Sequence, residues 1–212
     1  MLCNRFYSLI IKRLIDLLFS IILILCFSPI LIIIAFLVKI KLGSPIIFRQ
    51  KRPGLDEKLF KLYKFRTMKN IKDKNGELLP DSVRLTKFGE LLRRTSLDEL
   101  PELFNIIKGE MSLVGPRPLS ELYLPYYSEE EHKRHLIRPG LTGLAQIKGR
   151  NYLSWEERFE LDLYYVENVS LSLDLNILFK TLFIVIKRSD IGIIGIDFQD
   201  NSLDDVRKEK LN

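Results

Sequence analysis

Two adjacent carboxylates, Asp98 and Glu99, follow a pair of arginines in the segment Arg93–Glu102 (RRTSLDELPE). Phosphoryl transfer needs such a set, because a carboxylate can attack phosphorus or bind Mg²⁺ while arginines neutralise phosphate charge. A helix cap is the simpler interpretation. Ser96 to Glu99 matches a capping box, and each acid in a first helical turn gains about 0.3–1 kcal/mol. Pro101 fits this cap poorly, because it falls beyond the first turn. On these residues alone the cap is favoured over chemistry.

Further cations lie in loops rich in glycine and proline. In Gly115-Pro-Arg-Pro118 the two prolines fix the backbone on either side of Arg117, so a stiff loop presents this guanidinium and suits it to phosphate recognition. Arg138-Pro-Gly140 and Lys148-Gly-Arg150 also place a cation beside a backbone-breaking residue. A solvated arginine in an ordinary turn explains any one of these loops, and it explains all three less well.

Two histidines, His132 and His135, lie three residues apart in Glu129–His135 (EEEHKRH). A two-histidine metal site is one interpretation. A solvated, charged helix face is the favoured one, because all neighbouring residues are polar. The sequence contains no phosphate-binding loop ending in Gly-Lys-Ser/Thr, no dinucleotide fingerprint and no Gly-x-Ser-x-Gly elbow.

The elements that must position these residues begin with an uncharged run from Leu17 to Val38. At about 1.5 Å per residue, this run is long enough to cross a hydrocarbon core of about 30 Å. A chain of this size can hardly bury so apolar a helix on all sides, so the run predicts membrane insertion. A cleaved signal peptide is not expected, because the run is too long and no small-residue cleavage site follows it.

Ser28-Pro29 lies near the middle of this run and must bend or break the helix. The Ser28 hydroxyl is a possible partner for a backbone group that the proline frees. Both flanks of the run are rich in lysine and arginine, and the positive-inside rule assigns such flanks to the cytoplasm. If both flanks obey the rule, the segment enters and leaves the membrane on the cytoplasmic side. A kinked spanning helix is the alternative, and the residue pattern leaves both open. The flanking cations are Arg5, Lys12, Arg13, Lys39, Lys41, Arg49, Lys51 and Arg52.

The rest of the chain reads as a small α+β domain dominated by helices. Residues 45–50 and 59–65 are expected to be strands of a hairpin, with Arg52-Pro-Gly54 in the turn and a polar surface loop at 70–82. Apolar spacing predicts helices over 86–94, 98–108, 154–168 and 172–188, the third begun by a capping box of Ser154 and Glu157. The last helix is broadly apolar and could form core or lie in a membrane interface. The polar tail after Asp197 is expected to fray.

Charge is unevenly distributed along the chain of 212 residues, which carries a net charge of +6. Residues 1–70 contain 13 Lys and Arg against 3 Asp and Glu, a net of +10, so the remainder has a net of −4. A local anionic partner near the N-terminus is therefore expected, and binding of nucleic acid by the whole chain is not. The mean hydropathy of +0.05 is too low for a polytopic membrane protein. With only Cys3 and Cys26, neither a disulfide framework nor a cysteine-rich metal site can form.

Taken in order, these blocks of residues resemble small bacterial phosphoglycosyl transferases of the monotopic, polyprenyl-phosphate type. The resemblance extends from about Lys12 to Arg188 and matches the short form that acts in protein N-glycosylation, capsule and polysaccharide pathways. Its blocks are Ser28-Pro29, RPGLDEK (52–58), YKFRTM (63–68), SLDEL (96–100), NIIKGEMS (105–112), VGPRP (114–118), RPGLTGLAQ (138–146), GRN (149–151) and FELDLYYV (159–166).

The resemblance implies a reaction and roles for named residues. Such enzymes move a sugar 1-phosphate from a UDP-sugar to polyprenyl (undecaprenyl) phosphate and release UMP. Asp98 matches the nucleophile that forms a covalent phosphosugar intermediate, and Glu99 matches the partner carboxylate that holds Mg²⁺ together with it. Ser28-Pro29 matches the break of a re-entrant membrane helix. The basic residues that match the active-site lining are Lys64, Arg93, Arg117 and Arg150, with Arg93 a candidate for the lipid phosphate.

We therefore expect a re-entrant membrane helix over residues 1–41, a cytoplasmic catalytic domain with interfacial amphipathic helices over 42–190, and a tail over 191–212. The expected place is the cytoplasmic face of the bacterial inner membrane, with membrane lipids, the two substrates and downstream glycosyltransferases as partners and no nucleic acid. Two other functions use the same residues. One is a membrane-anchored, Mg²⁺-dependent diphosphate hydrolase, and the other is a non-enzymatic membrane adaptor in which Asp98-Glu99 only caps a helix.

Overall fold

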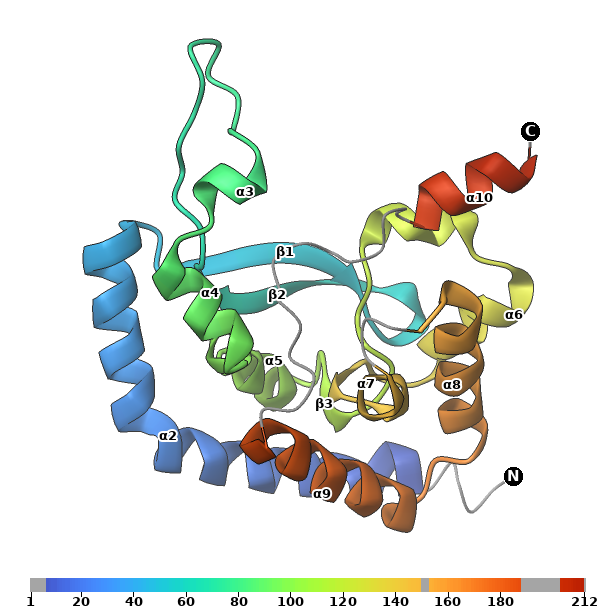
Figure 1. Cartoon of the computed structure of the whole chain (residues 1–212). Coiled ribbons are helices and arrows are strands. Elements are labelled where there is room, and N and C mark those ends of the chain that lie inside the picture. Colours follow the sequence, from blue (N-terminus) through green and yellow to red (C-terminus); the bar gives the residue numbers. More distant parts are fainter. Residues whose placement is uncertain (1–6, 150–152, 188–202, 212) are drawn as a thin grey trace.

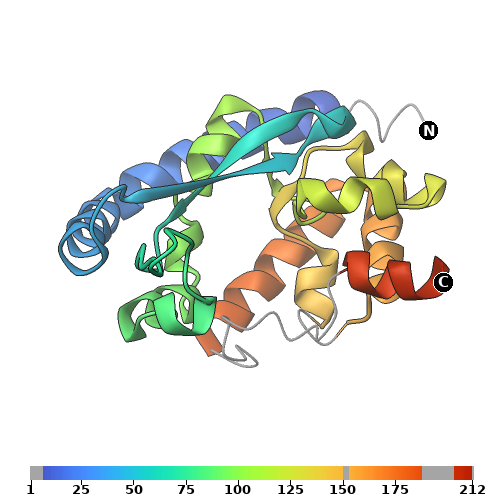
Figure 2. The same cartoon turned by 90° about the horizontal axis from the view of Figure 1, so that it is seen from above.

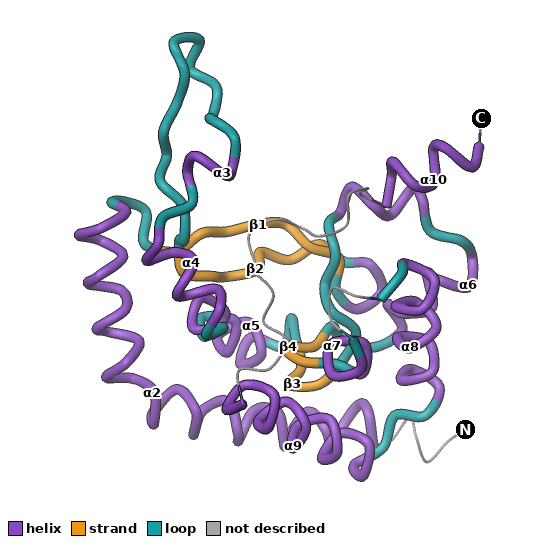
Figure 3. Tube along the Cα trace, viewed as in Figure 1, coloured by secondary structure: helices purple, strands orange, loops and turns teal. Residues whose placement is uncertain are grey.

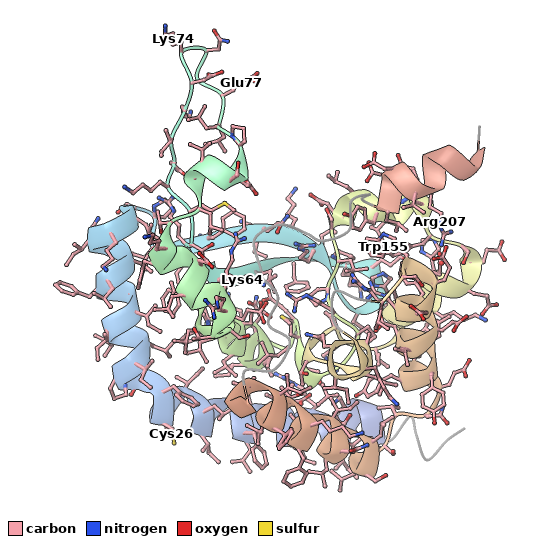
Figure 4. The ribbon with its side chains drawn as sticks, in the orientation of Figure 1. Cys26, Lys64, Lys74, Glu77, Trp155 and Arg207 are labelled. Carbon is pink, nitrogen blue, oxygen red and sulfur yellow. The ribbon has the colours of Figure 1, made fainter. Side chains whose placement is uncertain are left out.

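The longest element, the helix α2 (Lys12–Leu42), is bent into two arms (Figure 1). Pro29 lies inside the helix and has no N–H to offer the carbonyl of Leu25, four residues earlier. The Ser28 hydroxyl donates to that carbonyl instead, at 2.8 Å. Cys26, one turn before the proline, lies at the bend (Figure 4). The predicted bend at Ser28-Pro29 and the predicted role of the Ser28 hydroxyl are both confirmed, and the helix continues through the bend without a break.

Most of α2 is uncovered by the rest of the chain. Its apolar window has a mean hydropathy of 3.2, and only 11% of that window is buried, which makes α2 long and apolar enough to cross a membrane. Large apolar side chains point outward along both arms. They include Leu14, Leu18, Leu25, Ile32, Ile33 and Phe36. This exposed apolar surface identifies α2 as a membrane-anchoring helix.

The computed structural model describes residues 7–149, 153–187 and 203–211, and helices dominate it (Figure 3). Besides α2 the helices are η1 (Tyr7–Ile11), η2 (Leu55–Glu57), α3 (Asp81–Arg84), α4 (Lys87–Arg94), η3 (Leu97–Glu99), α5 (Glu102–Lys108), η4 (Glu121–Tyr126), α6 (Glu129–His132), η5 (Lys133–Leu136), α7 (Leu144–Lys148), α8 (Trp155–Glu167), α9 (Leu171–Lys187) and α10 (Leu203–Leu211). The strands are β1 (Ile47–Pro53), β2 (Leu59–Phe65), β3 (Ser112–Val114) and β4 (Gly140–Thr142).

The strands form two small sheets of two strands each. β1 and β2 form the expected antiparallel hairpin, in register from Ile47 opposite Phe65 to Pro53 opposite Leu59. Its turn lies at residues 54–58 and not at Arg52-Pro-Gly54, because Arg52 and Pro53 pair within the strand. Seen from above, the hairpin runs over the domain from the end of α2 (Figure 2). β3 and β4 pair in parallel. The sequence predicts a loop where β4 lies and no regular element where β3 lies. The predicted polar loop is exposed, with Lys74 and Glu77 at its tip (Figure 4), and it ends at residue 80 because α3 begins at Asp81.

The main core lies between the hairpin, α5, the small parallel sheet and the C-terminal helices. Phe60 and Leu62 of β2 meet Leu103 and Ile106 of α5 there, together with Ile177 of α9. A second cluster joins the second arm of α2 to the hairpin and α4. Its buried residues are Ile34, Val38, Leu42, Phe65 and Leu92. The anchor is therefore part of the domain's packing and not a detached tether.

Helix α9 has two apolar faces with different surroundings. Ile177 is fully buried in the core, whereas Phe179 and Phe183 are 69% and 64% exposed. The exposed face continues along the helix at Leu171, Leu175 and Leu182. The predicted helix is confirmed. One face forms core, and the other exposes its apolar side chains. In the view of Figure 1, α9 and the first arm of α2 lie at the same edge of the domain.

The C-terminal residues 203–211 form the helix α10, so the prediction that this stretch frays is wrong. Leu203 is fully buried in a cluster with Trp155 and Phe159. Arg207 donates to the Glu131 carboxylate at 2.6 Å. Figure 4 shows Trp155 and Arg207 on the same side of the molecule. The polar composition gives no sign of this docking, because it depends on Leu203 and Val206 packing on distant aromatic residues and on the ion pair of Arg207.

Truncating Leu203 to Ala is expected to lower the free energy of unfolding around α10 by about 2–5 kcal/mol, because it leaves a cavity beside aromatic rings. Trp155 is the only tryptophan of the chain, so its fluorescence during denaturant titration reports on this cluster. Leu122→Ala is the control, since that side chain is 72% exposed and its truncation should cost less than about 0.5 kcal/mol. Equal effects of the two changes would contradict the docking of α10.

Candidate active site

Lys64 enters the site from β2, on the same side of the strand as buried Phe60 and Leu62. This alternation carries its ammonium group inward, where Nζ lies 2.6 Å from Glu99 Oε1 and 3.3 Å from Glu102 Oε1. Figure 4 shows Lys64 in the middle of the molecule. A fully buried side chain, Asn105, fixes the strand against α5. Its amide accepts from the Tyr63 N–H at 3.0 Å and donates to the Lys61 carbonyl at 2.7 Å.

Asp98 and Glu99 lie in the short helix η3, immediately before α5. The chain turns into η3 through Ser96, which has a left-handed backbone with φ of 55°. The Ser96 side chain makes no capping hydrogen bond, and α5 begins at Glu102 with Pro101 as its N-cap. The capping box and the helix start at residue 98 are therefore wrong. Glu99 is drawn away from Ser96 because Lys64 and an arginine bind its carboxylate.

That arginine is Arg117, whose Nη2 lies 2.8 Å from Glu99 Oε1. It follows β3 in the Gly115-Pro-Arg-Pro118 loop, which the second small strand holds in place. The Gly115 N–H donates to the Thr142 carbonyl, and the Gly140 N–H donates to the Pro116 carbonyl, both at 2.9 Å. The Arg117 side chain is 42% exposed, so it can contact Glu99 and still reach a ligand.

Glycines at 115, 140 and 143 allow this loop to lie directly against the β4 backbone. A Cβ at Gly140 would lie 2.1 Å from the Gly115 nitrogen, and one at Gly143 would lie 2.2 Å from the Gly115 carbonyl oxygen. No side chain fits at these distances without a shift of the backbone. The spacing of glycines in the two loops thus sets where Arg117 stands.

Arg93 is brought to the site by α4, which Thr86 caps by accepting from the Gly89 N–H at 3.1 Å. Gly89 seats the helix on the backbone of the preceding loop, because a Cβ there would lie 1.8 Å from the Thr67 carbonyl oxygen. One turn later, Arg93 Nε donates to Thr67 Oγ1 at 3.0 Å. Its charge acts on Asp98 and lowers the pKa of that carboxyl.

The two carboxylates have opposite electrostatic surroundings. Burial raises the pKa of Asp98, and the charge of Glu99 raises it further, to about 6, although Lys64, Arg93 and Arg117 oppose both. Burial also acts to raise the pKa of Glu99, but Arg117 and Lys64 outweigh it and hold that pKa well below its usual range. Glu99 is therefore the fixed negative charge of the site, and Asp98 is a carboxyl of unusually high basicity.

Asp98 is buried, yet no described residue donates a hydrogen bond to its carboxylate. Both cations on Glu99 contact Oε1, and Oε2 has no hydrogen-bond partner in the described part of the chain. The site thus offers two hard oxygen ligands beside three cations. This is the arrangement in which Mg²⁺ binds through one or two carboxylates and completes its shell with water and substrate phosphates. Among the described residues, no group of three or more His, Cys, Asp or Glu could form an all-protein metal cage.

Some of the site residues predicted from the sequence contact one another directly. Lys64, Glu99 and Arg117 form one ion-paired group, and Asp98 and Arg93 lie within its electrostatic field. Arg150 lies outside the described residues. Glu102 was missed as a site residue, although it stands in the same acidic segment. Its side chain is 4% exposed and contacts Lys64, and burial followed by the charge of Glu99 raises its pKa to about 7.

The segment 129–135 is not the solvated face that the sequence predicted. Glu131, Arg134 and His135 are buried. Arg134 donates to Asp162 at 2.6 Å and to the Arg117 carbonyl at 2.8 Å, so it supports the loop of the site from behind. The described residues contain no metal-binding group here either; His132 hydrogen-bonds Glu57, and burial lowers the pKa of His135 to about 4. No local signal marks Arg134, because its partner lies 28 residues away.

The fold and this site define a membrane-anchored domain in which carboxylates and cations face a common point. The family model for bacterial sugar transferases matches residues 7–188, and the chain belongs to that family.

Among the curated relatives, an uncharacterized sugar transferase, EpsL of Bacillus subtilis, is 55% identical over 82% of this chain and 86% of its own length. The UDP-glucose:undecaprenyl-phosphate glucose-1-phosphate transferases of Klebsiella pneumoniae and Escherichia coli are 42% and 40% identical. These matches cover 83% and 82% of this chain but only 40% of each relative. The chain therefore spans about two fifths of the length of these two named transferases.

Proposed function

We propose that this chain is a phosphoglycosyl transferase that moves a sugar 1-phosphate from a UDP-sugar to polyprenyl (undecaprenyl) phosphate. The observation that carries the proposal is the pairing of two carboxylates: a buried Asp98 that accepts no hydrogen bond from any described residue, and a Glu99 that Lys64 and Arg117 hold in its charged form. A carboxylate left without donors keeps its lone pairs for attack on phosphorus. The family and the activities for which the relatives are named support the same reaction.

In the first step, an Asp98 oxygen attacks the β-phosphorus of the UDP-sugar. An oxygen–phosphorus bond to Asp98 forms, the bond from the β-phosphorus to the bridging oxygen breaks, and UMP leaves with that electron pair. Lys64, Arg93 and Arg117 surround the carboxylates and oppose the charge that gathers on the phosphate oxygens. The high basicity of Asp98 favours this attack, since a more basic carboxylate is the better nucleophile.

In the second step, an oxygen of polyprenyl phosphate attacks the same phosphorus. The bond to Asp98 breaks, the carboxylate is restored, and the product is a polyprenyl diphosphate sugar. The partly exposed Arg117 can hold one anion while the buried end of the site holds the phosphosugar. The proposed product is a substrate for downstream glycosyltransferases.

Asp98 and Glu99 would hold Mg²⁺, with Glu99 Oε2 and the Asp98 carboxylate as the free oxygen ligands. When bound, Mg²⁺ would neutralise diphosphate charge and assist departure of UMP. Lys64 and Arg117 keep Glu99 ionised. The Glu99 carboxylate could therefore bind the metal without first releasing a proton.

We place the globular part at the cytoplasmic face of the inner membrane, with α2 as a re-entrant helix. The bend at Pro29, the basic flanks of α2 and the exposed apolar face of α9 all support an attachment from one side. The net charge of +10 over residues 1–70 would add attraction to anionic headgroups, at about 1 kcal/mol per well-placed cation. A lipid-borne and a soluble anionic substrate could then meet at the site.

The test is UMP release by the full chain in nanodiscs, followed with and without polyprenyl phosphate. A covalent transferase gives a burst of UMP equal to the enzyme concentration without acceptor, and continuous turnover with it. Continuous release of free sugar phosphate without acceptor would indicate a diphosphate hydrolase. No nucleotide release at all would favour a membrane adaptor. The sugars in the names of relatives are glucose, galactose and N-acetylgalactosamine, so UDP-glucose, UDP-galactose and UDP-N-acetylgalactosamine form the first panel.

The bend predicts the topology of the N-terminus. Changing Ser28 and Pro29 together to Ala restores a backbone donor for the Leu25 carbonyl and should straighten α2 into a spanning helix. Cys3, in a chain with Cys26→Ser, should then react with a membrane-impermeant thiol reagent added outside spheroplasts. The matched chain with the bend intact should react only after permeabilisation. Labelling of that chain from outside would contradict the re-entrant arrangement.

A further inference from the structure

We infer that the first arm of α2 positions the active site through two side chains of one helix turn, Arg13 and Asp16. The membrane anchor then helps to set the geometry of the catalytic residues. This inference rests on the proposed function for its kinetic readout. Its structural basis is a set of contacts between α2 and the two segments that carry the reacting groups.

Asp16 holds the segment that carries Arg117. It is buried, with 3% of its surface exposed, although it sits on a helix whose other side chains are mostly apolar. Its Oδ2 accepts from Ser112 Oγ at 2.7 Å, and its Oδ1 accepts from the Leu113 N–H at 3.1 Å. Both oxygens are therefore used on consecutive residues of β3, the strand that leads directly into the Gly-Pro-Arg-Pro loop.

Arg13 holds the segment that carries the acids. Its Nη1 donates to the Ile106 carbonyl and its Nη2 to the Ile107 carbonyl, the latter at 2.8 Å. Both carbonyls lie in the last turn of α5, where a cation is favoured by the helix dipole, and the Ile106 carbonyl also accepts from the Gly109 N–H at 2.9 Å. The opposite end of α5 begins at Glu102, directly after η3 with its two carboxylates.

The two segments meet at the site through the 2.8 Å contact between Arg117 and Glu99. Each is short, with seven residues in α5 and three in β3, and each is held at its remote end by the same turn of α2. A shift of this arm would therefore change the position of Arg117 relative to Glu99. Arg13 and Asp16 touch no reacting atom, so they are positioning residues that act through α5 and β3.

The same helix offers a matched control for Asp16. Ser20 lies four residues further along, on the same face, and is fully buried. Its hydroxyl has no hydrogen-bond partner among the described residues. Ser20→Ala should therefore leave both segments in place. Asp16→Asn is the conservative variant, because an amide can still accept from Leu113 and can donate to a reversed Ser112 hydroxyl.

The experiment compares the full chain with Asp16→Ala, Asp16→Asn and Ser20→Ala in nanodiscs of phosphatidylethanolamine and phosphatidylglycerol. Hydrogen exchange is read at residues 97–104 and 112–117, with α8 as the internal reference, and kcat/KM is measured with the best UDP-sugar of the panel. Asp16→Ala should speed exchange at 112–117 at least tenfold and lower kcat/KM at least tenfold, with α8 unchanged. Asp16→Asn should stay within threefold of the unmodified chain, and Ser20→Ala should match it.

Three results would overturn the inference. The first is an Asp16→Ala chain whose exchange rates and kcat/KM stay within twofold of those of the unmodified chain. The second is a Ser20→Ala chain that changes exchange and kcat/KM as much as Asp16→Ala does. The third is faster exchange throughout the Asp16→Ala chain, α8 included, because that would assign Asp16 to general stability. Absence of UMP release from the unmodified chain would instead refute the proposed function, and the exchange comparison would still test the positioning.

Discussion

Asp98→Asn is expected to abolish UMP release, with a loss of about 10⁴-fold or more, because the amide cannot form the bond to phosphorus. The covalent phosphosugar intermediate should disappear with it. The measurement is a quench experiment with a UDP-sugar labelled in the β-phosphate, in which label stays on the unmodified chain when acceptor is absent. A variant that still turns over within tenfold would remove the nucleophile assignment.

The same substitution should leave the fold intact, which separates chemistry from stability. Burial and the charge of Glu99 raise the pKa of Asp98 to about 6, so the folded chain binds this proton more tightly than the unfolded chain does. Ionisation of Asp98 above that pH therefore works against folding, and a neutral amide removes this cost at pH 7. Asp98→Asn should unfold at the same or a higher temperature. The control is Asp56→Asn, because that side chain is 58% exposed and its change should alter neither property.

Local patterns predicted the elements whose cause is local. The hairpin strands and the capping box of Ser154 and Glu157 form as expected, because alternation and capping act within a few residues. The Ser28 hydroxyl also bonds where a proline leaves a carbonyl free. The same reasoning failed at Ser96, whose capping partner Glu99 binds instead two cations from β2 and the Gly-Pro-Arg-Pro loop. A nearby serine cannot compete with two full charges inside a buried site.

Features that depend on distant partners gave no usable pattern. The strands β3 and β4 are three residues each, too short for any alternation, and they pair across a separation of 28 residues. Arg134 looked solvated in a run of charges, yet it is buried because Asp162 on α8 accepts its hydrogen bonds. Asp16 stood as one acid at the edge of an apolar run. Its partners on β3 lie 96 and 97 residues further along the chain.

Glu99→Gln is expected to lower kcat by about 10²–10³-fold and to change the pH dependence of the reaction. The amide oxygen can still accept from Lys64 and Arg117, but the site loses its fixed negative charge and a metal ligand. The concentration of Mg²⁺ needed for half-maximal rate should therefore rise. UMP release at saturating UDP-sugar, measured over a range of Mg²⁺ concentrations, tests the lower kcat and the higher Mg²⁺ requirement.

The direction of the pH effect follows from the neighbouring charges. Asp98 attacks as a carboxylate, so the rate of the unmodified chain should rise about tenfold per pH unit below its pKa of about 6 and level off above it. Glu99 raises that pKa while Lys64, Arg93 and Arg117 lower it. Loss of the Glu99 charge leaves the cations unopposed, so the acid limb should move to lower pH.

Glu102→Gln is the matched control for this shift, since it replaces a second buried carboxyl on the same lysine, and the raised pKa of Glu102, about 7, already leaves that group mostly protonated in the acid limb. The main charges that shift the pKa of Asp98 are those of Glu99, Lys64, Arg93 and Arg117, so loss of Glu102 should move the acid limb much less than loss of Glu99 does. An acid limb that moves equally in both variants would show that Lys64 transmits the effect. A limb that moves in neither would mean that Asp98 is not the group whose ionisation limits attack.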